Sequence, residues 1–188
     1  MSDKTHVNEF SRIVEVEKIA PRGGHSMSIT AEPAERVAVA KRLGLLELDS
    51  LIANLTVERA ADGVSFTADG TFDADVVQEC VVSLTPLSAK LHDIVAGHFV
   101  PPQRLSMTGE PEEIENPLAE IPEPIIDGTI DLGELVVQHL ALALDPYPRQ
   151  PGVEPVLPRT VAPVADTQKP FAGLATLLKT KEKSDKKE

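Results

Sequence analysis

The stretch DGTIDLGELVVQHLALALDPYP, residues 127–148, carries the clearest structural signals in the sequence. It opens with the turn pair Asp127–Gly128. Asp131 then stands where a helix N-cap is expected, and Glu134 follows where a reciprocal capping partner is expected. The helix must end at Asp145–Pro146, because the residue before a proline is disfavoured in helical conformation. We therefore expect a well-delimited helix, and nothing in its sequence indicates catalysis.

This helix has one broad apolar face, built from residues at helical spacing. The residues are Leu132, Leu135, Val136, Leu140, Leu142 and Leu144. Such a face is buried against another apolar surface. We therefore expect the helix to cover one face of an antiparallel sheet.

The strands of that sheet are predicted from alternating apolar and polar residues. A segment that contains Phe66 and Phe72 is one of them, and the residues ADG at 61–63 predict a hairpin before it. Residues 86–101 read as one strand or a bent pair of strands. The other expected strands are residues 9–19, a short strand with Met27 and Ile29 after the turn that opens residues 23–30, and residues 48–60.

A further helix is predicted at EPAERVAVAKRLGL, residues 32–45. Pro33 suits its first turn, Glu35 suits the positive end of the helix dipole, and Gly44 suits a C-terminal cap. The expected fold class is therefore α+β, an antiparallel sheet of four to six strands packed by two helices.

The chain is expected to form a single domain with tails. We expect a flexible N-terminus at 1–8 and one domain at 9–145, in which 101–124 forms a mobile acidic loop. Prolines dominate residues 146–170, which we expect to be an extended linker. Residues 171–188 are expected to form a short docking helix and a lysine-rich tail.

The net charge of −12 is unevenly distributed along the chain. Residues 1–48 carry seven basic and seven acidic groups, whereas residues 49–134 carry three basic and seventeen acidic groups. Residues 135–188 carry eight basic and six acidic groups. The middle of the chain therefore favours a basic partner and repels a phosphate backbone. Aromatic residues make up only 3%, which argues against stacking platforms for single-stranded bases.

The sequence indicates a cytoplasmic protein without catalytic, cofactor-binding or metal-binding residues. A lone cysteine, Cys80, excludes an intramolecular disulfide, and we expect it to be a small buried hydrophobe. His92 and His98 fall on one face of a regular strand, too far apart for one metal ion unless the chain folds back at Gly97. The glycines in residues 21–26 lack the Lys and Ser/Thr of a phosphate loop. The carboxylates are expected in loops and strand turns, where raised pKa values are not implied. No signal peptide or membrane span is recognised.

Two segments are candidate contact sites for a macromolecular partner. The acidic stretch 110–123 is either a solvated loop or a surface for a strongly basic protein. The tail either folds back, solubilises the chain end or contacts a partner, with its lysines near RNA phosphates. The candidate contact residues in the tail are Phe171, Leu174, Leu177, Leu178, Lys179, Lys181 and Lys183.

The order of motifs over residues 10–179 resembles the YceD family of large ribosomal RNA subunit accumulation proteins. A cysteine-containing β segment precedes an acidic loop, an acid–Gly–x–Ile–Asp–Leu helix start, a leucine-rich helix and the tail KPFAGLATLLK at 169–179. The residues that carry the resemblance are Cys80, Asp127, Gly128, Asp131, Leu132, Leu140, Leu142 and Pro146. Many members have a Cys-x-x-Cys pair, but here Ser83 takes the second position. Serine is a poor zinc ligand, so the resemblance implies that a metal site at this pair is lost.

The resemblance implies a non-enzymatic factor in large ribosomal subunit biogenesis that supports accumulation of the large-subunit RNA. Its expected partner is a basic ribosomal protein or a pre-ribosomal particle, with an RNA contact through the tail. The alternative is an acidic adaptor for a non-ribosomal basic cytoplasmic protein. Neither interpretation involves a membrane, a cofactor or a small-molecule substrate.

Overall fold

The computed structural model describes residues 8–21, 23–105 and 122–154 of the chain. The chain divides into two units, Met1–Val153 and Glu154–Glu188. Apart from Glu154, the second unit lies outside the described residues, and so do the expected docking helix and tail.

The main sheet has five strands in the order β2–β3–β4–β5–β6. Neighbours from β2 to β5 are antiparallel, but β6 pairs with the end of β5 in parallel. The sheet is therefore mixed, and the expectation of a purely antiparallel sheet was wrong. The strands are β2 (His25–Thr30), β3 (Glu47–Arg59), β4 (Phe66–Glu79), β5 (Pro86–Val100) and β6 (Glu123–Pro124).

The parallel strand β6 gave no signal in the sequence because it is only two residues long and contains a proline. Its partners are Phe99 and Val100 at the end of β5. Residues 86–101 form one strand, since β5 runs unbroken from Pro86 to Val100. Part of the expected acidic loop is also helical, because Pro102–Leu105 forms the short helix α2. The structure thus has three helices among its described residues, where the sequence predicted two.

The first expected strand, residues 9–19, is much shorter in the structure. Only β1 (Ile13–Glu15) is extended and paired, and its partner is β7 (Thr129–Asp131) rather than the main sheet. A 3-10 turn at Val16–Lys18 follows. Phe10 is 1% exposed, so this segment is anchored by burial as well as by pairing.

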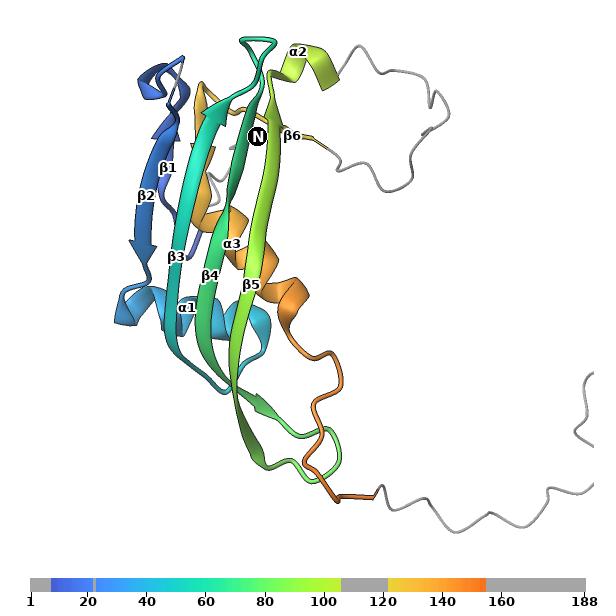
Figure 1. Ribbon diagram of the computed structural model, residues 1–188. Helices are drawn as coiled ribbons and strands as arrows, with labels where there is room; N and C mark the ends of the chain where they lie inside the picture. Colours follow the sequence, from blue (N-terminus) through green and yellow to red (C-terminus); the bar gives the residue numbers. More distant parts are fainter. Residues whose placement is uncertain (1–7, 22, 106–121, 155–188) are drawn as a thin grey trace, which may run out of the picture. The chain divides into compact units, whose positions relative to one another are not determined.

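The two long helices, α1 (Pro33–Leu43) and α3 (Leu132–Ala143), both lie on the same side of the main sheet (Figure 1). α1 ends at Gly44, whose φ of 68° is the left-handed conformation expected of a C-terminal cap. The helices and the inward-facing residues of the sheet form one core. Its largest buried side chains include Phe10, Phe66, Phe72, Leu51, Leu55, Leu132 and Leu140.

Two residues, Gly70 within the sheet and Leu142 on α3, mark local features of these elements. Gly70 of β4 lies against β3 so closely that a Cβ atom would overlap the backbone oxygen of Asn54. Leu142 was expected on the buried face of α3 but is 81% exposed. It lies near the end of the helix, beyond the part of α3 whose residues are buried in the core. The expectation for Leu142 was therefore wrong.

Candidate interaction face

One face of the main sheet is left uncovered by the described residues. Figure 1 shows α1 and α3 on one side of the sheet, and no described helix lies on the other side of β2, β3, β4 and β5. We call this surface the open face. Its residues alternate along each strand with the residues of the core, as strand geometry requires.

Carboxylates gather on the open face along β4. Asp69, Asp73 and Asp75 point outward, whereas their neighbours Ala68 and Phe72 are buried. Carboxylates were expected in loops and strand turns, and this expectation was wrong for the middle of β4. Alternation of acids with buried apolar residues was the signal that could have placed them on one face.

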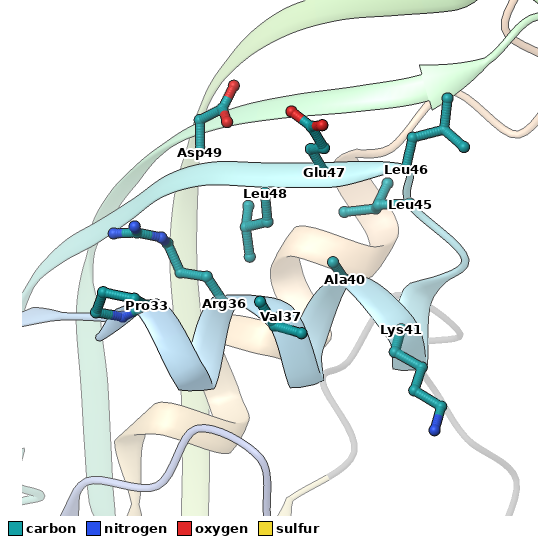
Figure 2. Close-up of a pocket in the computed structure, with 10 residues that line it drawn as sticks. All are labelled: Pro33, Arg36, Val37, Ala40, Lys41, Leu45, Leu46, Glu47, Leu48 and Asp49. Carbon is teal, nitrogen blue, oxygen red and sulfur yellow. The ribbon is translucent and has the colours of Figure 1, made fainter.

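The beginning of β3 adds two more carboxylates. The register with β4 shifts between Leu48 and Ser50, which is a β-bulge at Asp49. Glu47 and Asp49 consequently point to the side of the strand opposite Leu48 (Figure 2). Ser50 Oγ donates a hydrogen bond of 3.0 Å to Asp75 Oδ2, so this end of β3 belongs to the open face.

Basic groups on the open face are few. Lys90 of β5 lies 3.2 Å from Asp75, and hydrogen bonds from Lys90 and then Ser50 hold the pKa of this carboxyl below its ordinary value. His92 Nδ1 lies 2.8 Å from Asp73 Oδ1 on the same face. The outward-facing carboxylates without an ion pair to any described residue include Glu47, Asp49, Glu58 and Asp69.

The open face also presents two large apolar side chains. Ile52 of β3 is 40% exposed and Ile94 of β5 is 67% exposed. Ile52 is paired in register with Asp73, and Ile94 with Thr71. The face therefore combines unpaired negative charge with exposed apolar area, which suits a basic macromolecule better than a small anion.

On the covered side of the sheet, ion pairs connect α1 to the N-terminal segment and to α3. Arg12 and Glu35 form a bidentate pair with distances of 2.7 and 2.8 Å. Arg42 of α1 and Glu134 of α3 form another, with distances of 2.7 and 2.6 Å. These pairs connect residues distant in sequence, so no local pattern predicts them.

Asp131 is the N-cap of α3, as the sequence predicted. Its carboxylate accepts hydrogen bonds from the N–H groups of Gly133 and Glu134 at 3.0 and 3.4 Å. It also accepts from Arg12 N–H at 2.8 Å and from Asn8 Nδ2 at 2.9 Å. The reciprocal half of the expected capping arrangement was wrong, because the Glu134 side chain is engaged by Arg42 instead.

The structure places the other family-motif residues around α3. Asp127 and Gly128 form a turn with φ values of 50° and 71°. Leu132 and Leu140 are fully buried, and Pro146 is exposed just after the helix. Leu132 and Leu140 thus belong to the core on the covered side of the sheet, whereas Leu142 and Pro146 are exposed.

Cys80 lies buried at the start of the turn after β4. Its Sγ accepts hydrogen bonds of 3.4 Å from the N–H groups of Ser83 and Gln150. Hydrogen bonds from the Ser83 side chain and backbone, and then from Gln150, lower the pKa of the thiol to about 6, although burial opposes this shift. Ser83 Oγ is bound to Thr85 Oγ1 at 2.8 Å. The second position of the family pair thus belongs to a hydrogen-bonded turn.

No group of three or more metal-binding side chains occurs among the residues that the structure describes. The helices in these ranges are all too short or too polar to cross a membrane. His139 lies at the edge of the sheet, where its Nε2 is 2.8 Å from the backbone oxygen of Ala96 in β5.

Comparison with known proteins identifies the family. No curated protein and no solved structure matches the chain. The model of one family, described as large ribosomal RNA subunit accumulation protein YceD, matches residues 68–178. This match covers most of β4 and all of β5 and α3, with both Cys80 and the Asp131 cap. The chain belongs to the YceD family of large ribosomal RNA subunit accumulation proteins.

Proposed function

We propose that this protein is a non-enzymatic cytoplasmic factor that supports accumulation of large-subunit ribosomal RNA by holding a basic ribosomal protein or a pre-ribosomal particle. The family description names a role in accumulation of this RNA and names no reaction. The observation that carries the proposed mechanism is the open face, which presents exposed Ile52 and Ile94 together with carboxylates, several of which have no ion pair to a described residue. In this proposal the open face is the contact surface.

Charge complementarity supports a protein partner over RNA at this face. Asp69 and Asp73 would repel phosphates, and Lys90 is already paired with Asp75. A ribosomal protein presents lysine and arginine side chains that can replace the missing ion partners. Any RNA contact is assigned to the lysine-rich tail at 179–187, which adds a second attachment and so raises the effective affinity.

The proposal is tested by affinity capture of the full chain from its own cells, with and without nuclease treatment. Large-subunit ribosomal proteins should be captured in both conditions. The variant Asp69→Asn/Asp73→Asn should capture less, whereas Glu15→Gln/Glu17→Gln, which removes the same charge from β1 and the following turn, should capture as much as the wild type. Capture of a single non-ribosomal protein would favour the adaptor interpretation instead.

A second measurement addresses the cellular role. Cells that lack the protein should contain less large-subunit RNA relative to small-subunit RNA, and sucrose gradients should show fewer free large subunits. Restoring the Asp69→Asn/Asp73→Asn variant should rescue these cells less well than restoring the wild type. A normal ratio of subunits in the deletion strain would exclude the proposed role.

A further inference from the structure

The main sheet has a notch at the beginning of β3. β2 pairs with β3 only from Ile52 to Val57, so its strand ends opposite the middle of β3. Among the described residues, none pairs with Glu47–Ser50 on that side, and Figure 1 shows β3 continuing past the end of β2. The chain leaves β2 at this point and turns into α1.

A groove of about 570 Å³ lies at this notch, between α1 and the start of β3. Ala40, Leu45 and Leu48 contribute apolar surface, and Leu45 and Leu48 extend from the β3 side towards the helix (Figure 2). Val37 of α1 is 71% exposed and Leu46 is 45% exposed. Exposed large apolar side chains beside a groove that is partly apolar favour burial by a partner.

The charged side chains of the groove are divided between its two walls. Glu47 and Asp49 project from β3 on the side of the open face (Figure 2). Arg36 extends from α1 towards the strand and donates a weak hydrogen bond of 3.4 Å to the Ala31 oxygen. In the described ranges, neither these carboxylates nor Arg36 has an ion pair.

We propose that an extended segment of the basic partner adds to β3 at Glu47–Ser50, in line with β2. This inference rests on the proposed function and specifies how the partner docks. Side chains of an added strand alternate between the two faces of the sheet. Those on the helix side enter the apolar groove beside Val37, and those on the open face meet Glu47 and Asp49. The recognised segment therefore alternates apolar and basic residues, because a basic residue in the groove would meet Arg36.

A second copy of this chain fits the notch less well than a basic segment does. Two copies paired through this edge would bring the carboxylates of Glu47 and Asp49 together, and like charges on neighbouring strands are destabilising. Strand addition beside a helix is an established mode of peptide recognition, with affinity from the backbone and specificity from alternate side chains.

The test uses the full chain labelled with ¹⁵N and the peptide acetyl-Lys-Val-Lys-Val-Lys-Val-amide as the probe. Amide signals of residues 46–50 and 36–41 should shift on titration. The peptide acetyl-Glu-Val-Glu-Val-Glu-Val-amide should not shift them, nor should the basic peptide with N-methyl groups on its valines and lysines, which cannot donate backbone hydrogen bonds. Shifts confined to Asp69 and Asp73, or no shifts, would overturn the inference.

The matched variants are Val37→Asp and Ala34→Asp, both at exposed positions of α1. Val37→Asp should weaken peptide binding by about tenfold or more, since it removes an apolar contact from the groove. Ala34 does not line the groove, so Ala34→Asp should bind like the wild type. Equal binding by Val37→Asp and the wild type would contradict the docking mode.

The outcome separates this inference from the proposed function. If ribosomal capture depends on Asp69 and Asp73 but the peptide does not occupy the notch, only the docking mode fails. If the peptide binds the notch but the deletion strain has normal large subunits, only the ribosomal role fails.

Discussion

The two faces of the main sheet are made by alternate residues of the same strands, yet they differ in burial and in charge. In β4, Phe66, Ala68 and Phe72 are buried under the helices, whereas Asp69 and Asp73 face outward. The covered face is apolar and buried, whereas the open face carries charged side chains together with exposed apolar ones. The alternation separates the residues that determine the fold from the residues that are free to meet a partner.

The largest loss of stability is expected from a substitution on the covered face. Phe72→Ala removes a fully buried ring and should lower the free energy of unfolding by about 3–5 kcal/mol, because a cavity remains under α3 and α1. Its neighbour Thr71 is on the open face, and Thr71→Ala should cost less than about 0.5 kcal/mol. Urea denaturation measures both. Similar losses for the two variants would show that the open face is covered in solution.

A matched pair of variants on α3 should show the next largest difference in stability. Leu140 is fully buried, and Leu140→Ala should lower the free energy of unfolding by about 2–5 kcal/mol. Leu142 is 81% exposed, so Leu142→Ala should change it by less than about 0.5 kcal/mol. Denaturation of the two variants side by side checks this. A large loss at Leu142 would mean that a segment outside the described residues covers it.

Local patterns predicted most of the covered side. The helices, their caps at Asp131 and Gly44, and the long strands follow from spacing and alternation, which act within a few residues. The parallel strand β6 and the pairing of β1 with β7 could not be predicted. These pairings depend on which distant segments meet, and each involves only two or three residues.

The open face was predictable in part. Alternation places Asp69 and Asp73 opposite the buried residues, but the sequence alone does not say which face the helices leave uncovered. Nor does the sequence reveal the groove beside Val37. The groove exists because β3 begins at Glu47, whereas β2 pairs with β3 only from Ile52 onwards. The expected contact residues from Phe171 to Lys183 lie outside the described residues, and their role stays a prediction.

The Asp131 cap gives a smaller effect with a defined pH dependence. Asp131→Ala should cost about 0.5–2 kcal/mol at neutral pH, since α3 loses its cap and Arg12 its acceptor. Burial raises the pKa of this carboxyl, but hydrogen bonds from Arg12, Asn8 and neighbouring groups outweigh burial, so its pKa is lowered overall. The charged carboxylate therefore stabilises the fold above the pKa of the unfolded chain, about 4, and this contribution is lost as the pH falls.

Denaturation of Asp131→Ala and the wild type at a series of pH values checks this sign. The difference between them should be largest near neutral pH and should shrink below about pH 4. A difference that grows in acid would show that the protonated carboxyl is the stabilising form, which contradicts the hydrogen bonds that it accepts.

The smallest effect on stability should accompany the largest effect on binding. Asp69→Asn/Asp73→Asn removes two exposed charges, so the free energy of unfolding should change by less than about 0.5 kcal/mol for each. Association with a basic ribosomal protein should nevertheless slow, and its dependence on salt should weaken, because long-range attraction governs the encounter rate. Surface plasmon resonance at several salt concentrations measures both. Suppose that the double variant binds as fast as the wild type while Phe72→Ala loses stability as predicted. The covered face then stabilises the fold as expected, but the contact with the partner lies outside the open face.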